Sequence, residues 1–337
     1  MPRRDLWLSL VASVLIVAFA WGVSQPLRGF DTQGEDIYYA YIEGQRLVAG
    51  ENPYARILQG DMLTNDKYAT YFPLFYLFSA LLQMAGWRSY EAWIEVWRVL
   101  AVMQYIGIGL ALLWRITRRK GFWFGLASAA FWIASRWATF VLMILHLDLA
   151  ALLLLVLSML SWQKHRVTSL LLLSASLALK QIAVFVVPLY LVWAWKDAAD
   201  RPWRPVMRDG LLIASVPLLV SVPFAIWNLE GYVRSLMFSV TRSSDTAAVN
   251  AVLALSHRLE WPWLASWRGV IARLPMLGTM GLFYWLMWRD RIGRWMACLL
   301  VMATFISLNV TVFTQYLVWL MPLIPLAAME DRSPEPA

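Results

Sequence analysis

The stretch DIYYAYIEGQRLVAGENPY, residues 36–54, is a polar and aromatic segment that carries several acids. It follows the first long apolar run of the chain, residues 6–25, and apolar runs make up most of what comes after it. A segment that only links two membrane helices needs neither the acids nor the tyrosines. We therefore interpret residues 36–54 as a segment that holds a ligand at a membrane surface.

The composition outside this stretch is that of an integral membrane protein. Of the 337 residues, 61% are hydrophobic and only 15% are charged, whereas soluble domains are about 25% charged. Several apolar runs reach the roughly 20 residues that a helix needs to cross the hydrocarbon core. No polar stretch is long enough to bury a core of its own. The sequence predicts an all-α, polytopic transmembrane protein with a single integral membrane domain, residues 1–337.

The apolar runs predict about ten membrane spans. Their expected ranges are 6–25, 92–114, 121–137, 143–162, 167–179, 181–195, 209–228, 268–288, 295–310 and 315–329. The net charge of +8 comes from Lys and Arg that mostly flank these runs, which is the pattern of the positive-inside rule and does not indicate nucleic-acid binding. With Arg3 and Arg4 inside, we expect a multi-pass protein of the plasma (inner) membrane with both termini cytoplasmic.

Two segments decide how many times the chain crosses the membrane. Residues 72–86 are apolar but short and carry Pro73 in their first turn, so we expect a re-entrant or interfacial helix. Residues 167–195 contain Lys180, and a split there into two short helices returns the basic residues of both flanking loops to the cytoplasm. No Gly or Pro near Lys180 supplies a turn, so local turn chemistry opposes the split. We follow the charge bias because it acts on two loops at once.

This topology leaves two external regions. Residues 26–91 contain the expected juxtamembrane or re-entrant helices, and residues 229–267 form the second region. In the first region, residues 36–50 can form one helix that ends at Gly50. At helical spacing one face of this helix carries Asp36, Tyr39, Ala40 and Glu43.

A carboxylate in the first external region can serve as a general base, because it can accept the proton of an acceptor hydroxyl at the membrane surface. Asp36 is the first choice, with Asp31 and Glu35 as alternatives. An ordinary solvated acidic loop is the competing interpretation of the same residues.

The cations that could stabilise a phosphate leaving group lie further along the chain. Lys180 is embedded between two apolar runs, where a charge is costly enough to indicate function, and we expect a neutral side chain of the same length there to leave folding unharmed. Arg136 lies at an external helix end. Each of the two could instead reach the interface as a snorkelling side chain. The second external region adds Arg242, Arg258 and the substrate-contacting candidate His257.

His146 and Asp148 open the expected span 143–162 on its outer side. Because residues i and i+2 point to different helix faces, we expect this pair to hydrogen-bond at a cavity wall and not to bind a metal. A helix cap by Asp148 is the alternative. The single Cys298 excludes an internal disulfide and a cysteine-cluster metal site. No metal site and no cofactor are expected. The sequence does not decide whether a divalent cation binds.

The order of these patches resembles the GT-C superfamily of membrane glycosyltransferases. The likeness is greatest to its family-87 and GPI-mannosyltransferase-like members, which use polyprenyl-phosphate mannose. It rests on the matching topology and on four patches, residues 36–54, 71–74 (YFPL), 146–180 and 315–322 (QYLVWLMP). The family-87 pattern of Asp, two residues and Tyr falls on Asp36 and Tyr39, and Asp31 and Glu35 are alternative matches.

The resemblance implies an inverting transfer of a single, mannose-like sugar from a polyprenyl-phosphate donor to a lipid, glycan or protein acceptor at the external membrane face. Asp36 would be the general base. The donor phosphate would be held by Lys180, Arg136, Arg242 and Arg258. The substrate cavity would involve Tyr39, Glu43, Tyr54, His146, Asp148, His257, Gln315 and Tyr316. The alternative is a transporter or flippase of lipid-linked sugars, in which the same charges line a path.

Overall fold

The computed structural model describes residues 1–60, 68–198, 203–241, 273–309 and 312–330, and every regular element in these ranges is a helix. The α-helices are α1 (Arg3–Ser24), α2 (Asp36–Val48), α3 (Leu74–Met84), α4 (Tyr90–Lys120), α5 (Phe122–Ile133), α6 (Arg136–Met143), α7 (Asp148–Ser161), α8 (Arg166–Leu179), α9 (Val187–Lys196), α10 (Trp203–Trp227), α11 (Leu229–Thr241), α14 (Leu274–Trp288), α15 (Arg294–Leu308) and α16 (Leu323–Ala328). The 3₁₀ helices are η1 (Pro26–Gly29), η2 (Ala55–Leu58), η3 (Gln181–Val186) and η7 (Thr314–Leu320). The all-α prediction is confirmed for this part of the chain.

Three described helices are long and apolar enough to cross a membrane: α1 continued by η1, α4 and α10. The bent pair α5 and α6, with 46° between its helices, makes a fourth if it counts as one span. Other apolar helices are shorter. The 14 residues of α7 or α8 extend about 21 Å at 1.5 Å per residue, less than the roughly 30 Å of a hydrocarbon core. The expected ten apolar segments are thus largely helical, but ten complete spans are not established.

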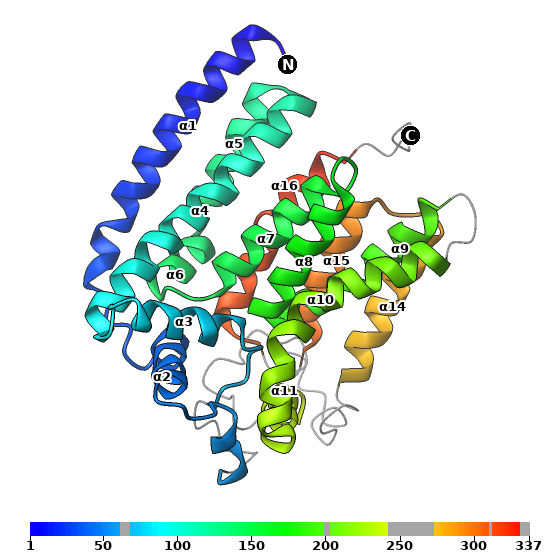
Figure 1. Cartoon of the computed structure of the whole chain (residues 1–337). Coiled ribbons are helices and arrows are strands. Elements are labelled where there is room, and N and C mark those ends of the chain that lie inside the picture. The colour runs from blue at the N-terminus through cyan, green and yellow to red at the C-terminus, as the bar shows by residue number, and fades with distance from the viewer. Residues whose placement is uncertain (61–67, 199–202, 242–272, 310–311, 331–337) are drawn as a thin grey trace, which may run out of the picture.

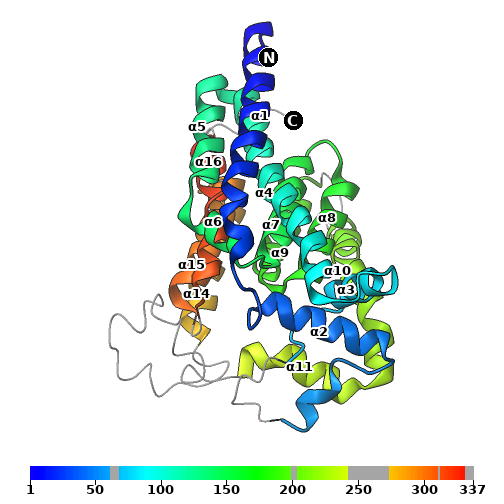
Figure 2. The ribbon, with the colours of Figure 1, turned by 90° about the vertical axis from the view of Figure 1, so that its left-hand side faces the viewer.

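The helices form two layers. A bundle that includes α1, α4, α5, α7, α8, α15 and α16 runs along the length of the molecule, and α2, α3 and α11 lie at one end of it (Figures 1 and 2). The N-terminus of α1 lies at the opposite end of the bundle. The expected interfacial segment contains α3, whose 11 residues are too few to cross a bilayer. This end layer supplies the site described below.

The long helix α4 is well defined at both ends and packs closely on α5. The Ser89 hydroxyl accepts a hydrogen bond from the Ala92 amide and caps the first turn. Gly121, at φ +90°, makes the turn into α5. A Cβ at Gly125 would lie 2.6 Å from the Leu113 carbonyl oxygen, so only glycine lets α5 approach the α4 backbone this closely.

The predicted split at Lys180 is confirmed. Helix α8 ends at Leu179, Lys180 is extended (φ −149°, ψ 122°), and the chain resumes as η3 and α9. The Trp162 indole before α8 donates to the Asp197 carboxylate after α9 at 2.9 Å, so both ends of the segment lie at the same end of the bundle. The turn needs no Gly or Pro, because extended backbone at Lys180 followed by a 3₁₀ helix changes the chain direction.

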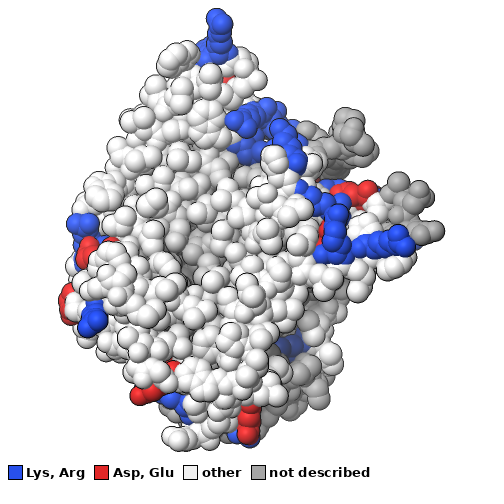
Figure 3. Space-filling view, viewed as in Figure 1, with Lys and Arg blue, Asp and Glu red and all other residues white. Residues whose placement is uncertain are grey.

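The basic residues that flank these helices gather at the end of the bundle remote from α2 and α3. Lys and Arg cluster on the upper right of the molecule in Figure 3. Several are paired with acids: Arg166 lies 2.6 Å from Asp209, and Arg294 lies 2.6 Å from Asp197. Basic residues also lie at the other end, among them Arg46, Arg56 and Arg234, so the cluster is a bias of the kind that the positive-inside rule uses to set orientation.

Single cysteines at the two ends of the bundle test the topology. Gln59, after η2, and Lys164, between α7 and α8, are both exposed, and the native Cys298 is fully buried and gives no background. We expect Gln59→Cys to react with an impermeant thiol reagent in intact cells and Lys164→Cys to react only after the membrane is opened. Reaction of both variants in intact cells would contradict the expected orientation.

Candidate functional site

A cavity of about 320 Å³ lies between the end layer and the bundle, and residues from both build its walls. Its acids are Glu35, Asp36 and Glu43, its tyrosines are Tyr39, Tyr68, Tyr71, Tyr76 and Tyr316, its other polar residues are Thr70, Thr314 and Gln315, and its apolar residues are Ala40, Phe140, Ile144, Phe238 and Phe313. The cavity is therefore lined by acids that include Asp36 and Glu43 of α2 and by apolar residues that include Phe140 of α6 and Phe313 just before η7. Such a mixture suits an amphipathic ligand.

Helix α2 supplies acids to the cavity as its periodicity predicts. It runs over Asp36–Val48 and is followed by Gly50 at φ +78°, the left-handed conformation in which helices commonly end. The whole face predicted from helical spacing, Asp36, Tyr39, Ala40 and Glu43, lines the cavity. The Asp36 side chain remains 30% exposed, so its carboxylate can meet a ligand.

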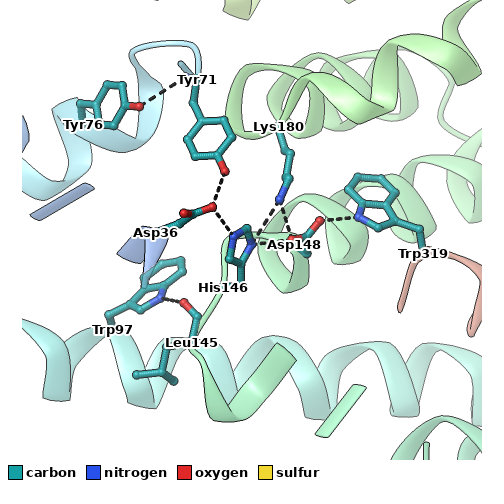
Figure 4. Close-up of polar contacts among 9 residues, drawn as sticks. All are labelled: Asp36, Tyr71, Tyr76, Trp97, Leu145, His146, Asp148, Lys180 and Trp319. Atoms are coloured by element: carbon teal, nitrogen blue, oxygen red, sulfur yellow. Dashed lines mark hydrogen bonds and ion pairs between the residues drawn. The ribbon is translucent and has the colours of Figure 1, made fainter. Parts of the chain in front are cut away.

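Asp36 is held by two partners from distant parts of the chain. Its Oδ2 accepts a hydrogen bond from the Tyr71 hydroxyl at 3.1 Å, and it lies 2.9 Å from His146 Nε2 (Figure 4). The Tyr71 hydroxyl and His146 Nε2 thus fix one carboxylate oxygen.

Behind His146 lies a buried charge cluster. His146 Nδ1 lies 2.5 Å from Asp148 Oδ2 and 3.2 Å from Lys180 Nζ. The Lys180 ammonium donates to Asp148 Oδ2 at 2.6 Å, and the Trp319 indole donates to the other oxygen of Asp148. The side chains of His146, Asp148 and Lys180 are at most 3% exposed. Because water is nearly excluded, these groups interact far more strongly than surface charges would, and this interaction offsets the cost of burying them.

The contact between His146 and Asp148 corrects the expectation that their side chains diverge. That expectation holds only inside a helix, and α7 begins at Asp148 itself. His146 precedes the helix in a turn where Leu145 has φ +53° and its carbonyl accepts a hydrogen bond from the Trp97 indole at 2.8 Å. The N-cap position of α7 is Leu147, without a side-chain cap, and the Asp148 carboxylate contacts His146, Lys180 and Trp319 instead. Hydrogen bonding behind the cavity wall, and not capping, is its role in the structure.

Lys180 joins this cluster but does not line the cavity. Its ammonium lies 5.5 Å from the centre of the Tyr71 ring and 5.4 Å from that of Tyr316, and both rings are part of the cavity wall. Among the described lining residues there is no Lys or Arg. Contact of Lys180 with a donor phosphate therefore stays a prediction, and its observed partner is Asp148.

Glu43 marks the far edge of the cavity. Its carboxylate is 2% exposed and lies 3.0 Å from the Arg56 guanidinium and 3.4 Å from that of Arg46. Burial raises the pKa of the Glu43 carboxyl above its usual value, and the two guanidiniums oppose that rise. Gln315 and Tyr316 line the cavity as expected.

Other predicted residues lie away from the cavity. Arg136 is exposed, with its guanidinium 5.3 Å from the centre of the Trp137 ring. Tyr54 is fully buried behind the wall, where its hydroxyl donates to the Tyr71 carbonyl at 2.8 Å. Asp31 accepts the Gln33 amide in a local turn and is not among the lining residues. Three further candidates lie outside the described residues: Arg242, His257 and Arg258.

Two important partners were not predicted as site residues, namely Tyr71 and Trp319. Both belong to the short patches YFPL and QYLVWLMP that carry the family resemblance. The signal in the sequence was therefore the polar and aromatic character of those patches. Their contacts to Asp36 and Asp148 depend on the tertiary fold.

No protein-family model and no curated protein matches this chain. Its class is therefore defined by the fold and the site alone. It is an all-helical protein, over the described residues, with helices able to cross a membrane. A carboxylate-bearing cavity lies at one end of the bundle. The described residues contain no cluster of His, Cys, Asp and Glu that could hold a metal ion.

The ion pair reverses the expectation that a neutral residue at position 180 leaves folding unharmed. Lys180→Met leaves the Asp148 carboxylate buried without its cation, which costs about 3–5 kcal/mol. In a double-mutant cycle, adding Asp148→Asn should recover part of that loss. The measurement is unfolding in detergent, followed by tryptophan fluorescence.

Lys196→Met is the matched control. Lys196 forms an ion pair with Asp290, whose side chain is 80% exposed, so its loss should change stability by less than about 1 kcal/mol. Equal stability of Lys180→Met and the unaltered protein would contradict the importance of the buried pair.

Proposed function

We propose that the chain is a GT-C-type glycosyltransferase that moves one sugar from a polyprenyl-phosphate donor to an acceptor hydroxyl at the external membrane face. The observation that carries the proposal is the Asp36 carboxylate, which is partly exposed to the cavity and held by Tyr71 and His146. The resemblance of the four sequence patches to that superfamily supports the same conclusion.

In the proposed reaction the acceptor hydroxyl oxygen attacks the anomeric carbon of the donor sugar. Asp36 takes the hydroxyl proton, the bond between the anomeric carbon and the phosphate oxygen breaks, and polyprenyl phosphate leaves with the bonding electrons. A single displacement of this kind inverts the anomeric configuration. General-base removal of a proton by a positioned carboxylate contributes about 10²–10⁴-fold to such steps.

The cluster behind Asp36 suits this role. A hydrogen bond from His146 Nε2 fixes the Asp36 carboxylate in place, while Nδ1 of the same ring contacts Lys180 and Asp148. Lys180 lies against the Tyr71 and Tyr316 rings of the cavity wall, and its ammonium, paired with Asp148, holds this cluster in position. Arg242 and Arg258 remain the proposed direct partners of the leaving phosphate.

The apolar lining of the cavity supports a lipid-linked donor. Phe140 and Ile144 extend it from the end of α6, and Phe313 continues it just before η7. A polyprenyl chain can lie along such a surface while its sugar faces α2.

Transfer of label from a radiolabelled polyprenyl-phosphate mannose to membrane lipids tests the proposal, using the purified protein with no nucleotide sugar added. A labelled glycoconjugate that depends on the protein is expected. Movement of the labelled lipid across liposomes with no new glycoconjugate would contradict transfer and favour a flippase.

Asp36→Asn tests the base. The substitution keeps the shape of the side chain but removes proton acceptance, so we expect the transfer rate to fall by roughly 10²-fold or more with donor binding nearly unchanged. Asp31→Asn is the control, because Asp31 is not among the residues that line the cavity. Near-normal transfer by Asp36→Asn would move the role to Glu35, which lines the same cavity, and Glu35→Gln would then be measured.

A further inference from the structure

A second cavity lies beside the first, on the other side of Glu43. Its volume is about 440 Å³, and its lining includes Arg46, Glu51, Asn52, Arg56, Trp227 and Asn228. These residues come from the end of α2, the turn after it, η2, and the junction of α10 with α11. Glu43 connects the two cavities, because it lines the first and its carboxylate contacts two arginines that line the second.

The charges at this second cavity are balanced. Arg46 lies 3.2 Å from Glu51 and 3.4 Å from Glu43, and Arg56 lies 3.0 Å from Glu43. Two guanidiniums therefore face two carboxylates. An anionic ligand would have to displace carboxylates that already occupy the arginines. A hydroxyl group both donates and accepts hydrogen bonds, so it can bridge an arginine and a carboxylate without displacing either.

Unsatisfied polar atoms are concentrated at the same place. Asn52 Nδ2 is buried and has no hydrogen-bond partner among the described residues, while Glu43 Oε2 and Arg46 Nε face each other at 3.4 Å in an ion pair without a hydrogen bond. Buried polar atoms are nearly always hydrogen-bonded, to protein or to a bound molecule. The unmatched Asn52 donor beside this loosely paired carboxylate and guanidinium favours a ligand with neutral hydroxyl groups, which donate and accept at the same atom.

An aromatic ring completes the second cavity. Trp227 ends α10 and is 50% exposed. The corner after it is held in place, because Asn228 Oδ1 accepts the Gly231 amide at 2.9 Å and a Cβ at Gly231 would lie only 2.6 Å from the Tyr54 carbonyl oxygen. The half-exposed Trp227 indole offers a flat apolar face, and the C–H face of a sugar ring is flat and apolar as well.

We infer that the second cavity binds a neutral carbohydrate, and, resting on the proposed function, that this carbohydrate is the head of the acceptor. Asp36 and Glu43 are seven residues apart on α2, which is about 10 Å along the helix axis. An acceptor seated beyond Glu43 has to reach past it to present a hydroxyl to Asp36. The acceptor head is therefore an oligosaccharide and not a single sugar.

Saturation-transfer NMR with neutral saccharides tests the inference on the full chain in lipid nanodiscs. The probes are mannose, mannobiose, mannotriose and the corresponding glucose series. We expect at least one trisaccharide to bind, and to bind more tightly than its monosaccharide. Trp227→Ala should weaken that binding ten-fold or more. Trp203→Ala is the matched control, since Trp203 begins the same helix, is 57% exposed, and lies at the other end.

Absence of saccharide binding, or equal weakening by Trp203→Ala, overturns the inference. Displacement of the bound saccharide by inorganic phosphate also overturns it, because the cavity would then be an anion site. The outcome is separable from the proposed function. Saccharide binding that depends on Trp227, without any sugar transfer, would support the carbohydrate site in the second cavity and contradict the transferase proposal. Sugar transfer with an unchanged kcat/KM in Trp227→Ala would support the transferase proposal and contradict the second cavity as the acceptor site.

Discussion

The ion pair between Lys180 and Asp148 is the constraint on which the rest of the site depends. Both groups are almost completely buried, and either one alone would be a charge left uncompensated in a low-dielectric interior. Their pairing fixes the end of α8 against the start of α7. That junction orients His146 in turn, and His146 holds the carboxylate of Asp36 in the end layer. One buried contact thus aligns the bundle with the helix that faces the cavity.

The two layers differ in the side chains that they expose. The bundle is apolar along its length, and its exposed hydrophobic side chains on α1 and α10 suit contact with lipid. The end layer carries the acids of α2 and the tyrosines that face them. Short helices are possible in this arrangement because α7, α8 and α9 meet polar partners where they end, so their terminal groups are not left in hydrocarbon.

Much of this architecture follows from local patterns in the sequence. Apolar runs predicted the helices, the spacing of Asp36, Tyr39 and Glu43 predicted the cavity face, and charge bias predicted the break at Lys180. The sequence could not predict features that depend on distant contacts. Leu145 adopts a left-handed conformation that its side chain disfavours. Trp319 reaches Asp148 from 171 positions away. The number of complete spans was also beyond pattern analysis, because apolar composition alone does not separate a short helix buried in a bundle from a helix that crosses.

A structure of the protein in a lipid nanodisc with a non-reactive phosphonate analogue of polyprenyl-phosphate mannose tests the central claim most directly. The account predicts that the sugar occupies the cavity between α2 and η7. The Asp36 carboxylate should then lie on the face of the anomeric carbon opposite the phosphonate, with His146 still bound to it. A sugar bound elsewhere, or an Asp36 side chain turned away from it, would contradict the account.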